Sequence, residues 1–457
     1  MKPLCVVSCP IDTFSGYGAR SRDFVKGLIQ SKGEEWDIKI LPQRWGDTPW
    51  NFLPQDSLLK QRFIGGLDPN RQPDIWIQVT VPNEFQPVGR YNIGVTAGIE
   101  TNIFPAEFLE GMNRMNLNLV SSRFGVEVAQ ASSFEKRDNK TNEVQGTVKL
   151  EKPLNVLFEG LNLDVYNKKP QNSELLKDIH EDFCFLFTGH WLPGKFGEDR
   201  KDVATLITTF LETFKGPGKK KPALILKTNH LNYSLMDKSE ILKKIHILKD
   251  SFSGNLPNIY LIHGEMTDKE MNQLNNDNKV KAFISFTKGE GFGRPLLEQA
   301  ITGKPVITTN WSGQVDFLKK EYNCLIGGEL KNVHKSAANQ FLLKDSKWFS
   351  IDKAIAGRAM KDVVKKYKHY FKNSRKQTQY LKDNFSFDKM VERINELMPV
   401  VESGPQVNTL SLPKLKKTDS SGPSLPKLKL PKLNKVDPSV QPTNKKPNKL
   451  TLPKLKI

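Results

Sequence analysis

The sequence predicts an α/β protein with two parallel sheets, followed by a basic C-terminal tail that does not fold alone. Three observations support this prediction. The chain has 457 residues, more than one ordinary hydrophobic core holds. Short apolar runs alternate with helix-compatible segments over residues 1–330, a pattern typical of βαβ units. From Pro405 onward the composition changes to Pro, Lys, Ser and Asn.

The first series of apolar runs predicts one parallel sheet in the N-terminal part of the chain. The expected strands are Leu4–Ser8, Ile38–Leu41, Ile75–Val79, Tyr91–Val95, Leu117–Val120 and Leu154–Phe158. Helices are expected between them at Ala19–Ile29, Pro105–Met115 and Arg123–Ala131. The polar stretch Ser132–Asn142 is expected to form a loop.

A second series predicts another parallel sheet, and the chain is expected to cross to it between Asn162 and Asp182. The expected strands are Phe183–Phe187, Ala223–Leu226, Ile259–Ile262, Ala282–Phe286 and Val306–Thr308. Two such sheets facing each other would leave a cleft at the C-terminal ends of their strands. Ligands of open α/β sheets bind at such ends.

Composition excludes several classes of protein. No apolar run approaches the roughly 18 residues that a membrane span needs. The N-terminal apolar run stops at Pro10 and continues into a glycine loop, so no signal peptide is expected. Four cysteines form no CxxC pair, which argues against a zinc site or a disulfide framework and favours a reducing, cytoplasmic compartment.

The net charge of +19 raises the question of a nucleic-acid partner. From Pro405 to the end there are twelve Lys and two Asp, so 12 − 2 = +10 lies in the tail and +9 in the rest. No aromatic residue interleaves the tail lysines to stack on bases, so nucleic-acid binding is a minor hypothesis. The tail repeats a short unit, LPKLK or LPKLN, starting at Leu412, Leu425, Leu430 and Leu452. Either it is a solvated extension, or the repeat docks on a protein or an anionic surface.

The strongest functional signal is the segment Gly289–Phe317, GEGFGRPLLEQAITGKPVITTNWSGQVDF. It follows a predicted buried strand and opens a helix, where free backbone N–H groups suit an anion. These groups belong to Gly291, Phe292 and Gly293. Glu290 is expected just before the helix and Glu298 two turns into it. Both carboxylates can then accept hydrogen bonds from the hydroxyls of one ligand.

This segment resembles the Glu-x7-Glu motif of retaining GT-B glycosyltransferases of the family 4 type. The resemblance implies a GT-B fold, with two facing Rossmann-like domains and a cleft between them. It also implies that Glu290 lies by the sugar of a nucleotide-sugar donor, with the loop amides, and that Glu298 binds the ribose hydroxyls. The resemblance extends over the chain to about Met398.

A second match covers Phe185–Phe214, which resembles the strand, basic loop and helix that hold the donor diphosphate in this family. It implies that Lys201 and Arg200 bind the diphosphate, and that His190 stands where the family has an arginine. Positive charge at this place stabilises the anion that leaves in the reaction. Neither a metal ion nor a cofactor is expected.

A third match is Ser15–Gly18, whose Gly16 and Gly18 are expected to line the donor side of the cleft in a loop before the first helix. Tyr91–Ala129 also resembles N-terminal domains of the family. Glu100 and Thr101 end a strand there and are candidates for contact with the acceptor, with a capping or packing role as the alternative. The expected domains are residues 1–165, residues 166–385, a helix crossing back at 386–402 and the tail at 403–457.

The resemblance implies transfer of a hexose from a nucleoside-diphosphate sugar to a glycan or other hydroxyl acceptor, with retention of configuration. One alternative enzyme is a sugar-nucleotide epimerase. A nicotinamide oxidoreductase is disfavoured because the first loop lacks the GxGxxG spacing. A different alternative is a catalytically degenerate sugar-binding or assembly protein that the tail tethers.

Overall fold

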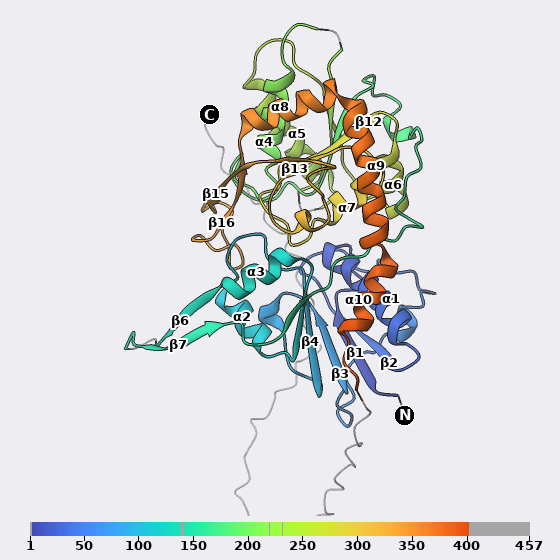
Figure 1. Cartoon of the computed structure of the whole chain (residues 1–457), viewed down its shortest axis with the longest axis vertical. Coiled ribbons are helices and arrows are strands. Elements are labelled where there is room, and N and C mark those ends of the chain that lie inside the picture. The colour runs from blue at the N-terminus through green and yellow to red at the C-terminus, as the bar shows by residue number, and fades with distance from the viewer. Residues whose placement is uncertain (1, 139–140, 219, 231, 402–457) are drawn as a thin grey trace, which may run out of the picture. The chain divides into compact units, whose positions relative to one another are not determined.

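A computed structural model of the chain describes residues 2–138, 141–218, 220–230 and 232–401 (Figure 1). The predicted tail at 403–457, with its repeated units, lies outside the described residues.

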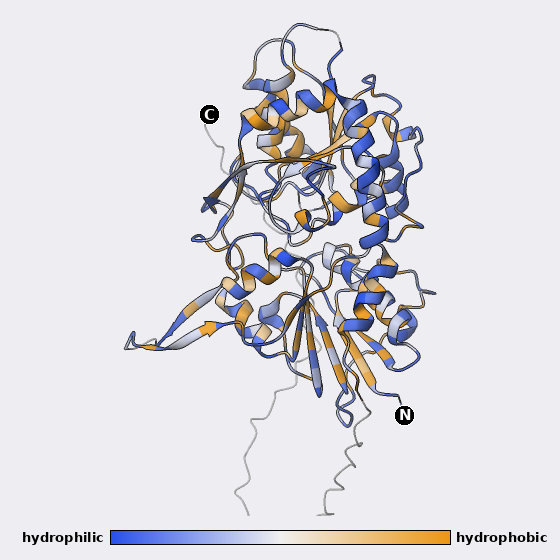
Figure 2. Ribbon diagram, in the orientation of Figure 1, coloured by the Kyte–Doolittle hydropathy of each residue, from blue (hydrophilic) through white to orange (hydrophobic). Residues whose placement is uncertain are grey.

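The first sheet contains every strand that the sequence predicts for the N-terminal part of the chain. Its six strands are all parallel and lie in the order β2-β1-β3-β4-β5-β8. Their bounds are Leu4–Cys9 (β1), Asp37–Pro42 (β2), Ile75–Val79 (β3), Tyr91–Thr96 (β4), Leu117–Val120 (β5) and Leu154–Val156 (β8). The inner strands are apolar on both faces, because helices cover both sides of the sheet (Figure 2).

The helices of this part are α1 (Gly16–Lys32), α2 (Ala106–Asn113) and α3 (Arg123–Ala131), with 3₁₀ turns η1 (Lys60–Arg62) and η2 (Pro82–Glu84). Helix α1 begins at Gly16 rather than Ala19. Ser15 caps it, since the Ser15 Oγ accepts a hydrogen bond from the Gly18 N–H at 2.9 Å. The two glycines therefore belong to the first helical turn and not to a loop.

The prediction of a loop at Ser132–Asn142 was wrong. This stretch contains β6 (Ser133–Arg137), which pairs antiparallel with β7 (Val144–Lys149) in a hairpin that projects from the first sheet's side of the molecule (Figure 1). Phe134 and Val148 are paired in register and pack on the apolar cluster around α2. The other hairpin residues are exposed, so their polar composition concealed the strand period.

The second sheet has six parallel strands in the order β11-β10-β9-β12-β13-β14, again including every predicted strand. Their bounds are Cys184–Thr188 (β9), Ala223–Lys227 (β10), Ile259–Ile262 (β11), Val280–Ser285 (β12), Val306–Thr309 (β13) and Cys324–Ile326 (β14). The order reverses between β9 and β12, and such a reversal opens a crevice for ligands at the strands' C-terminal ends.

Helices surround the second sheet, and a short antiparallel hairpin follows it. The helices are α4 (Val203–Phe214), α5 (Leu235–Asp250), α6 (Asp268–Asn276), α7 (Arg294–Ala300), α8 (Lys353–Lys365) and α9 (Tyr367–Asn384), with 3₁₀ turns η3 (Glu174–Leu176) and η4 (Gly313–Asp316). The hairpin is β15 (Gly328–Asn332) with β16 (Lys347–Ile351). The last helix, α10 (Phe387–Leu397), returns to the first sheet, where Met390 and Ile394 join the core beside α1.

Within the described ranges, no helix has the length and apolarity that a membrane crossing requires. The four cysteine thiols are free, and three of them are fully buried in the sheets. No group of three or more His, Cys, Asp or Glu side chains among the described residues is arranged to hold a metal ion.

Candidate functional site

The structure brings Glu290, Lys201 and Arg200 together at the C-terminal edge of the second sheet. The Lys201 ammonium pairs closely with Glu290 Oε1, and Arg200 Nη1 lies 3.2 Å from Glu290 Oε2. A third partner is the Thr287 hydroxyl, which donates a hydrogen bond to Glu290 Oε1 at 2.7 Å. All three charged side chains are at most 17% exposed, so they form a compact, largely buried charge cluster.

The loop that carries Glu290 is fixed from both sides. The Glu290 N–H donates to Ser312 Oγ and the Gly313 N–H donates to the Glu290 carbonyl oxygen, both at 2.9 Å. Gly293 has φ +99°, a left-handed conformation that glycine adopts without strain, and it turns the chain into α7. Helix α7 starts at Arg294, so Glu298 lies about one turn into it and not two.

The same loop meets the first half of the chain closely. Neither Gly289 nor Gly291 has room for a Cβ, because the carbonyl oxygens of Glu100 and Ala97 lie against them. Ser122, which caps α3, donates from its Oγ to the Gly291 carbonyl oxygen at 2.6 Å. These contacts hold the Glu290 loop between the C-terminal edges of the two sheets.

Glu290 is charged in this cluster. Burial alone would raise the pKa of its carboxyl group, but the attraction of Lys201 and Arg200 outweighs burial and lowers the pKa to about 2. The two cations precede α4, where positive charge opposes the helix dipole. The Glu290 carboxylate therefore neutralises cations that would otherwise lie unpaired and largely buried.

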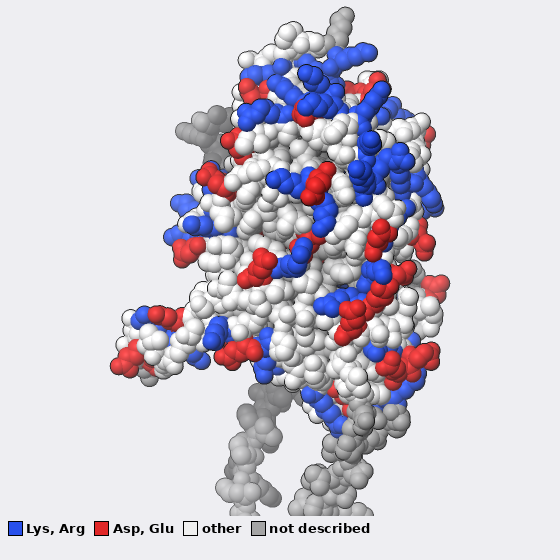
Figure 3. All heavy atoms as spheres, viewed as in Figure 1, with Lys and Arg blue, Asp and Glu red and all other residues white. Residues whose placement is uncertain are grey.

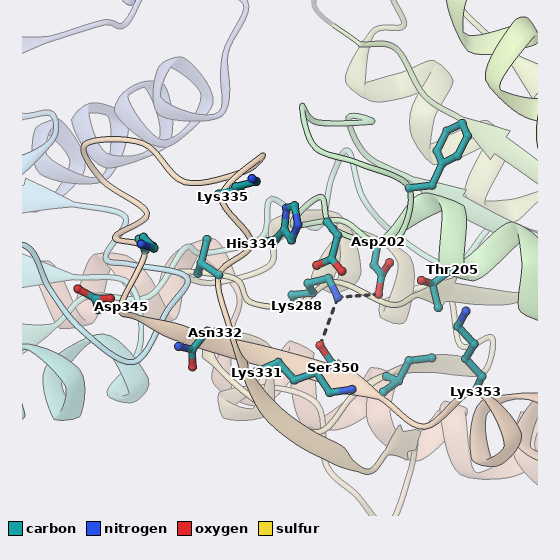
Figure 4. Close-up of a pocket in the computed structure, with 16 residues that line it drawn as sticks. Asp202, Thr205, Lys288, Lys331, Asn332, His334, Lys335, Asp345, Ser350 and Lys353 are labelled. Atoms are coloured by element: carbon teal, nitrogen blue, oxygen red, sulfur yellow. Dashed lines mark hydrogen bonds and ion pairs between the residues drawn. The ribbon is translucent and has the colours of Figure 1, made fainter.

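A second ion pair, between Lys288 and Asp202, lies next to this cluster. Lys288 Nζ lies 3.1 Å from Asp202 Oδ2 and 3.3 Å from Ser350 Oγ (Figure 4). The Lys288 N–H also donates to the Arg200 carbonyl oxygen at 2.7 Å. Asp202 has φ +52°, an unusual conformation for a residue other than glycine, at the start of α4. Lys288 and Asp202 line a separate cavity of about 580 Å³ beneath the β15–β16 hairpin.

His190 lies on the same strand-end loop as Lys201. Its side chain is exposed, yet enough protein surrounds it that burial, with repulsion from Lys201 and Arg200, lowers its pKa to about 4. Its imidazole is neutral at pH 7 and adds no positive charge to the Glu290 cluster.

Glu298 lies in a second charge cluster, which is separate from Glu290. Arg294 Nε lies 2.8 Å from Glu298 Oε1, and the Arg294 Nη1 pairs closely with Asp23 on α1. Glu159 is 3.7 Å from the same Arg294 nitrogen. Burial raises the pKa of Glu298 to about 7; Arg294 opposes this rise, and the nearby Asp268 and Asp23 add to it. One arginine thus serves several carboxylates that come from both halves of the chain.

Of the remaining predicted residues, some border the Glu290 cluster or are exposed, and others are buried in the packing. Gly16 is exposed with open space beside it, whereas Gly18 is buried against Thr13 at the α1 N-terminus. Glu100 is half-buried, with its Oε1 3.5 Å from Arg200 Nη1, so it borders the Glu290 cluster. Thr101 is fully buried and donates to the Ile103 carbonyl oxygen, which fits the packing alternative for this residue. The Phe292 ring is a core side chain packed on Phe317.

Sequence reasoning missed four residues that shape the site: Thr287, Ser312, Arg294 and Asp23. Arg294 lies inside the segment Gly289–Phe317, directly after the glycine loop. A cation at the start of a helix opposes the helix dipole and therefore indicates that an anionic partner lies nearby. Thr287 and Ser312 are hydroxyls whose importance depends on backbone geometry. Asp23 reaches the site only because the two sheets face each other.

No protein-family model and no curated protein matches this sequence. Solved structures do match its fold. HepE of Anabaena, in complex with UDP and glucose, superposes with a TM-score of 0.56 at 12% identity, covering 86% of this chain and 98% of HepE. The sucrose-phosphate synthase of Thermosynechococcus elongatus gives 0.55 at 10% identity, over 87% and 98% of the two chains.

A glycosyltransferase of Rickettsia africae gives a TM-score of 0.55 at 13% identity, over 87% of this chain and 97% of that one. These matches and the two facing parallel sheets show that the chain has the GT-B fold. At such low identity, the likeness extends to the fold alone.

Proposed function

We propose that this protein is a glycosyltransferase that moves a sugar from a nucleoside-diphosphate donor to an acceptor hydroxyl. One observation carries the proposal: a buried glutamate, Glu290, is held between Lys201 and Arg200 beside the glycine loop of a GT-B fold. This arrangement offers cations for a diphosphate and a carboxylate for sugar hydroxyls within one site.

Donor binding would exchange partners within the cluster. The diphosphate brings negative charge to Lys201 and Arg200, which releases the Glu290 carboxylate to accept hydrogen bonds from the sugar. The bond between the anomeric carbon and the phosphate oxygen then breaks, and its electron pair stays on that oxygen. The two cations, already buried and fixed, stabilise this developing charge without reorganisation.

Retention of configuration is part of the proposal and rests on the Glu-x7-Glu resemblance. The acceptor oxygen would attack from the side that the diphosphate leaves, and the departing phosphate oxygen would take the acceptor's proton. The matched motifs offer no side chain that is an obvious covalent nucleophile. Glu100, 3.5 Å from Arg200, is the proposed contact for the acceptor, and no metal ion is required.

UDP-glucose is the first donor to test, because HepE was solved in complexes with UDP-glucose and with UDP and glucose. The transferred group is proposed to be a hexose, and the compartment cytoplasmic, in keeping with free buried thiols.

The rival function is a sugar-binding or assembly protein without turnover. Two observations favour it. His190 is neutral where the family has an arginine, and Arg294 already occupies Glu298, the proposed ribose ligand. In this reading the protein would bind a nucleotide sugar and would not cleave it.

Release of free nucleoside diphosphate distinguishes the two functions. The wild type, Glu290→Gln and Lys201→Ala are incubated with UDP-, GDP-, ADP- and dTDP-sugars, with and without mixed glycan acceptors. Release that depends on both residues supports the transferase. Saturable donor binding with no release under any acceptor condition would establish the rival function.

A further inference from the structure

The positive charge of the described chain is concentrated on two consecutive helices, α8 and α9. Residues 353–384 hold ten Lys and Arg and two Asp, so 10 − 2 = +8. Outside the tail the chain carries +9, and 9 − 8 = +1 remains for everything else. Figure 3 shows Lys and Arg gathered over these helices, where few acidic side chains lie.

Helix α9 arranges its cations on one face. The basic positions 368, 372, 375, 376 and 382 are separated by four, three, one and six residues, which places all five within about 120° of the helix circumference. The opposite face is buried through Ser374, Gln377, Thr378 and Leu381. All five cations are exposed, in a row about 21 Å long.

Lys168, from the segment between the two sheets, adds a sixth cation to this row. Its ammonium lies 5.4 Å from the centre of the Phe371 ring on α9. Burial and the neighbouring Arg375 and Lys382 lower the pKa of Lys168, so these positive groups crowd one another. We call the six residues the α9 patch: Lys168, Lys368, Lys372, Arg375, Lys376 and Lys382.

No carboxylate among the described residues forms an ion pair with any member of the α9 patch. Like charges three or four residues apart on a helix each cost a few tenths of a kcal/mol. Here such pairs recur, as between Lys368 and Lys372 and between Lys372 and Lys376. Asp383 is the one carboxylate of α9 and forms no ion pair with these cations among the described residues, so an external polyanion would relieve the remaining repulsion.

We propose that the α9 patch is a docking surface for the phosphate backbone of a nucleic acid. A row of exposed cations along one helix is the electrostatic footprint of such a partner. The surface lacks what other partners need. None of the exposed large apolar side chains of the described chain lies on α9, so there is neither a wedge for a bilayer nor an apolar centre for a protein interface.

The length of the row also fits a duplex. B-form DNA presents one phosphate per about 1.7 Å of its axis, counting both strands, so a row about 21 Å long faces several phosphates at once. None of the Phe and Tyr rings of α9 is among the exposed large apolar side chains, so the cations of the α9 patch would contact the phosphate backbone. Binding should therefore depend on salt and not on sequence.

The test measures the anisotropy of a fluorescein-labelled duplex of about 20 base pairs at salt concentrations from about 50 to 200 mM. The full chain is compared with an α9 variant in which Lys368, Lys372, Arg375, Lys376 and Lys382 become Gln. A matched control replaces five exposed lysines elsewhere, which removes the same charge: Lys136, Lys238, Lys243, Lys269 and Lys320. Gln preserves helix propensity, and circular dichroism checks the fold.

If four of the cations contact phosphates, the slope of log K against log salt becomes shallower by about 3.6 in the α9 variant. Affinity at about 100 mM salt should fall at least tenfold, and the control should change little. Replacing the four α9 lysines by Arg should restore binding, which separates lost charge from lost folding.

Equal losses in the α9 variant and the control would overturn the proposal, because net charge alone would then explain binding. Sedimentation with phosphatidylserine vesicles supplies the other contrary result. If the α9 variant loses vesicle binding and keeps duplex binding, the surface docks on a membrane. The proposal does not depend on the glycosyltransferase function, since both assays measure binding without turnover.

Discussion

Replacing Glu290 by Gln tests whether this carboxylate and a donor diphosphate compete for the same two cations, Lys201 and Arg200. Gln keeps the size of the side chain and its contact with Thr287, but removes the negative charge between Lys201 and Arg200. The pKa of Glu290 falls from 4.5 to about 2 in the fold. Those roughly 2.5 units, at 1.36 kcal/mol each, correspond to about 3 kcal/mol of stability at pH 7.

The loss should be visible as a lower melting temperature. At about 2.1 cal/mol/K per residue over roughly 400 residues, 3 kcal/mol amounts to about 4 °C. A carboxyl group with a lowered pKa stabilises the fold above the unfolded value and loses that effect as pH falls through the folded value. The gap between wild type and variant should therefore narrow between about pH 4.5 and pH 2.

Nucleoside diphosphate should reverse this destabilisation. It supplies negative charge to the same two cations, so the variant should bind it at least as tightly as the wild type, with a larger rise in melting temperature. Turnover should fall about 100-fold or more, as when a fixed electrostatic group is removed from an active site. Glu110→Gln, an exposed carboxylate on α2, serves as control and should leave all three quantities unchanged. Diphosphate binding lost in step with turnover would refute the exchange of partners.

Four further variants, at three positions, test the surrounding charges. Lys201→Ala should weaken nucleoside diphosphate binding by about 10- to 100-fold in calorimetry, the value of one or more charge-assisted hydrogen bonds, and a loss below about threefold would argue against its role. Bound nucleoside diphosphate should raise the pKa of His190 from about 4. The affinity of the wild type for the diphosphate, relative to that of His190→Asn, should therefore increase as pH falls from 7 to 5. His190→Arg should bind the diphosphate about tenfold tighter than the wild type at pH 7. Because the pKa of Glu298 is raised in the fold, the wild type loses stability as pH rises from 4.5 through about 7. The melting temperature of Glu298→Gln relative to that of the wild type should therefore rise by about 3 °C between pH 5 and pH 8. A difference that stays constant with pH would contradict this prediction.

Inner strands such as β1 and β9 could be predicted from the sequence because they are buried on both faces and therefore mostly apolar, and edge strands such as β2 because their buried residues alternate. The β6–β7 hairpin could not, since only Phe134 and Val148 pack against the protein and the rest of its composition is that of a loop. The start of α1 was missed for a related reason. Two glycines signal a turn, and it is the Ser15 cap that makes them helical.

The Glu290 cluster was accessible to sequence reasoning because each of its members lies in a motif tied to a strand end. Parallel strands bring such ends to one edge, so residues 89 positions apart meet there. The ion pair between Arg294 and Asp23 joins residues 271 positions apart, from opposite sheets. No local sequence pattern predicts this ion pair, because Asp23 lies on the amphipathic helix α1, whose charged side is expected to face water.

The α9 patch shows the same difference between composition and placement. Dividing the charge between the tail and the rest of the chain assigns half of the excess to the tail and does not locate the other half. Eight of those nine charges lie in the contiguous residues 353–384, and the fold turns the α9 cations outward because Gln377 and Thr378 on the opposite face hydrogen-bond to Phe317, Asn323 and Ala300. Among the described residues no carboxylate pairs with these cations, although the exposed Asp383 lies on the same face, so the α9 cations repel one another. A partner that supplies negative charge would relieve this repulsion, and the salt dependence of duplex binding tests for it.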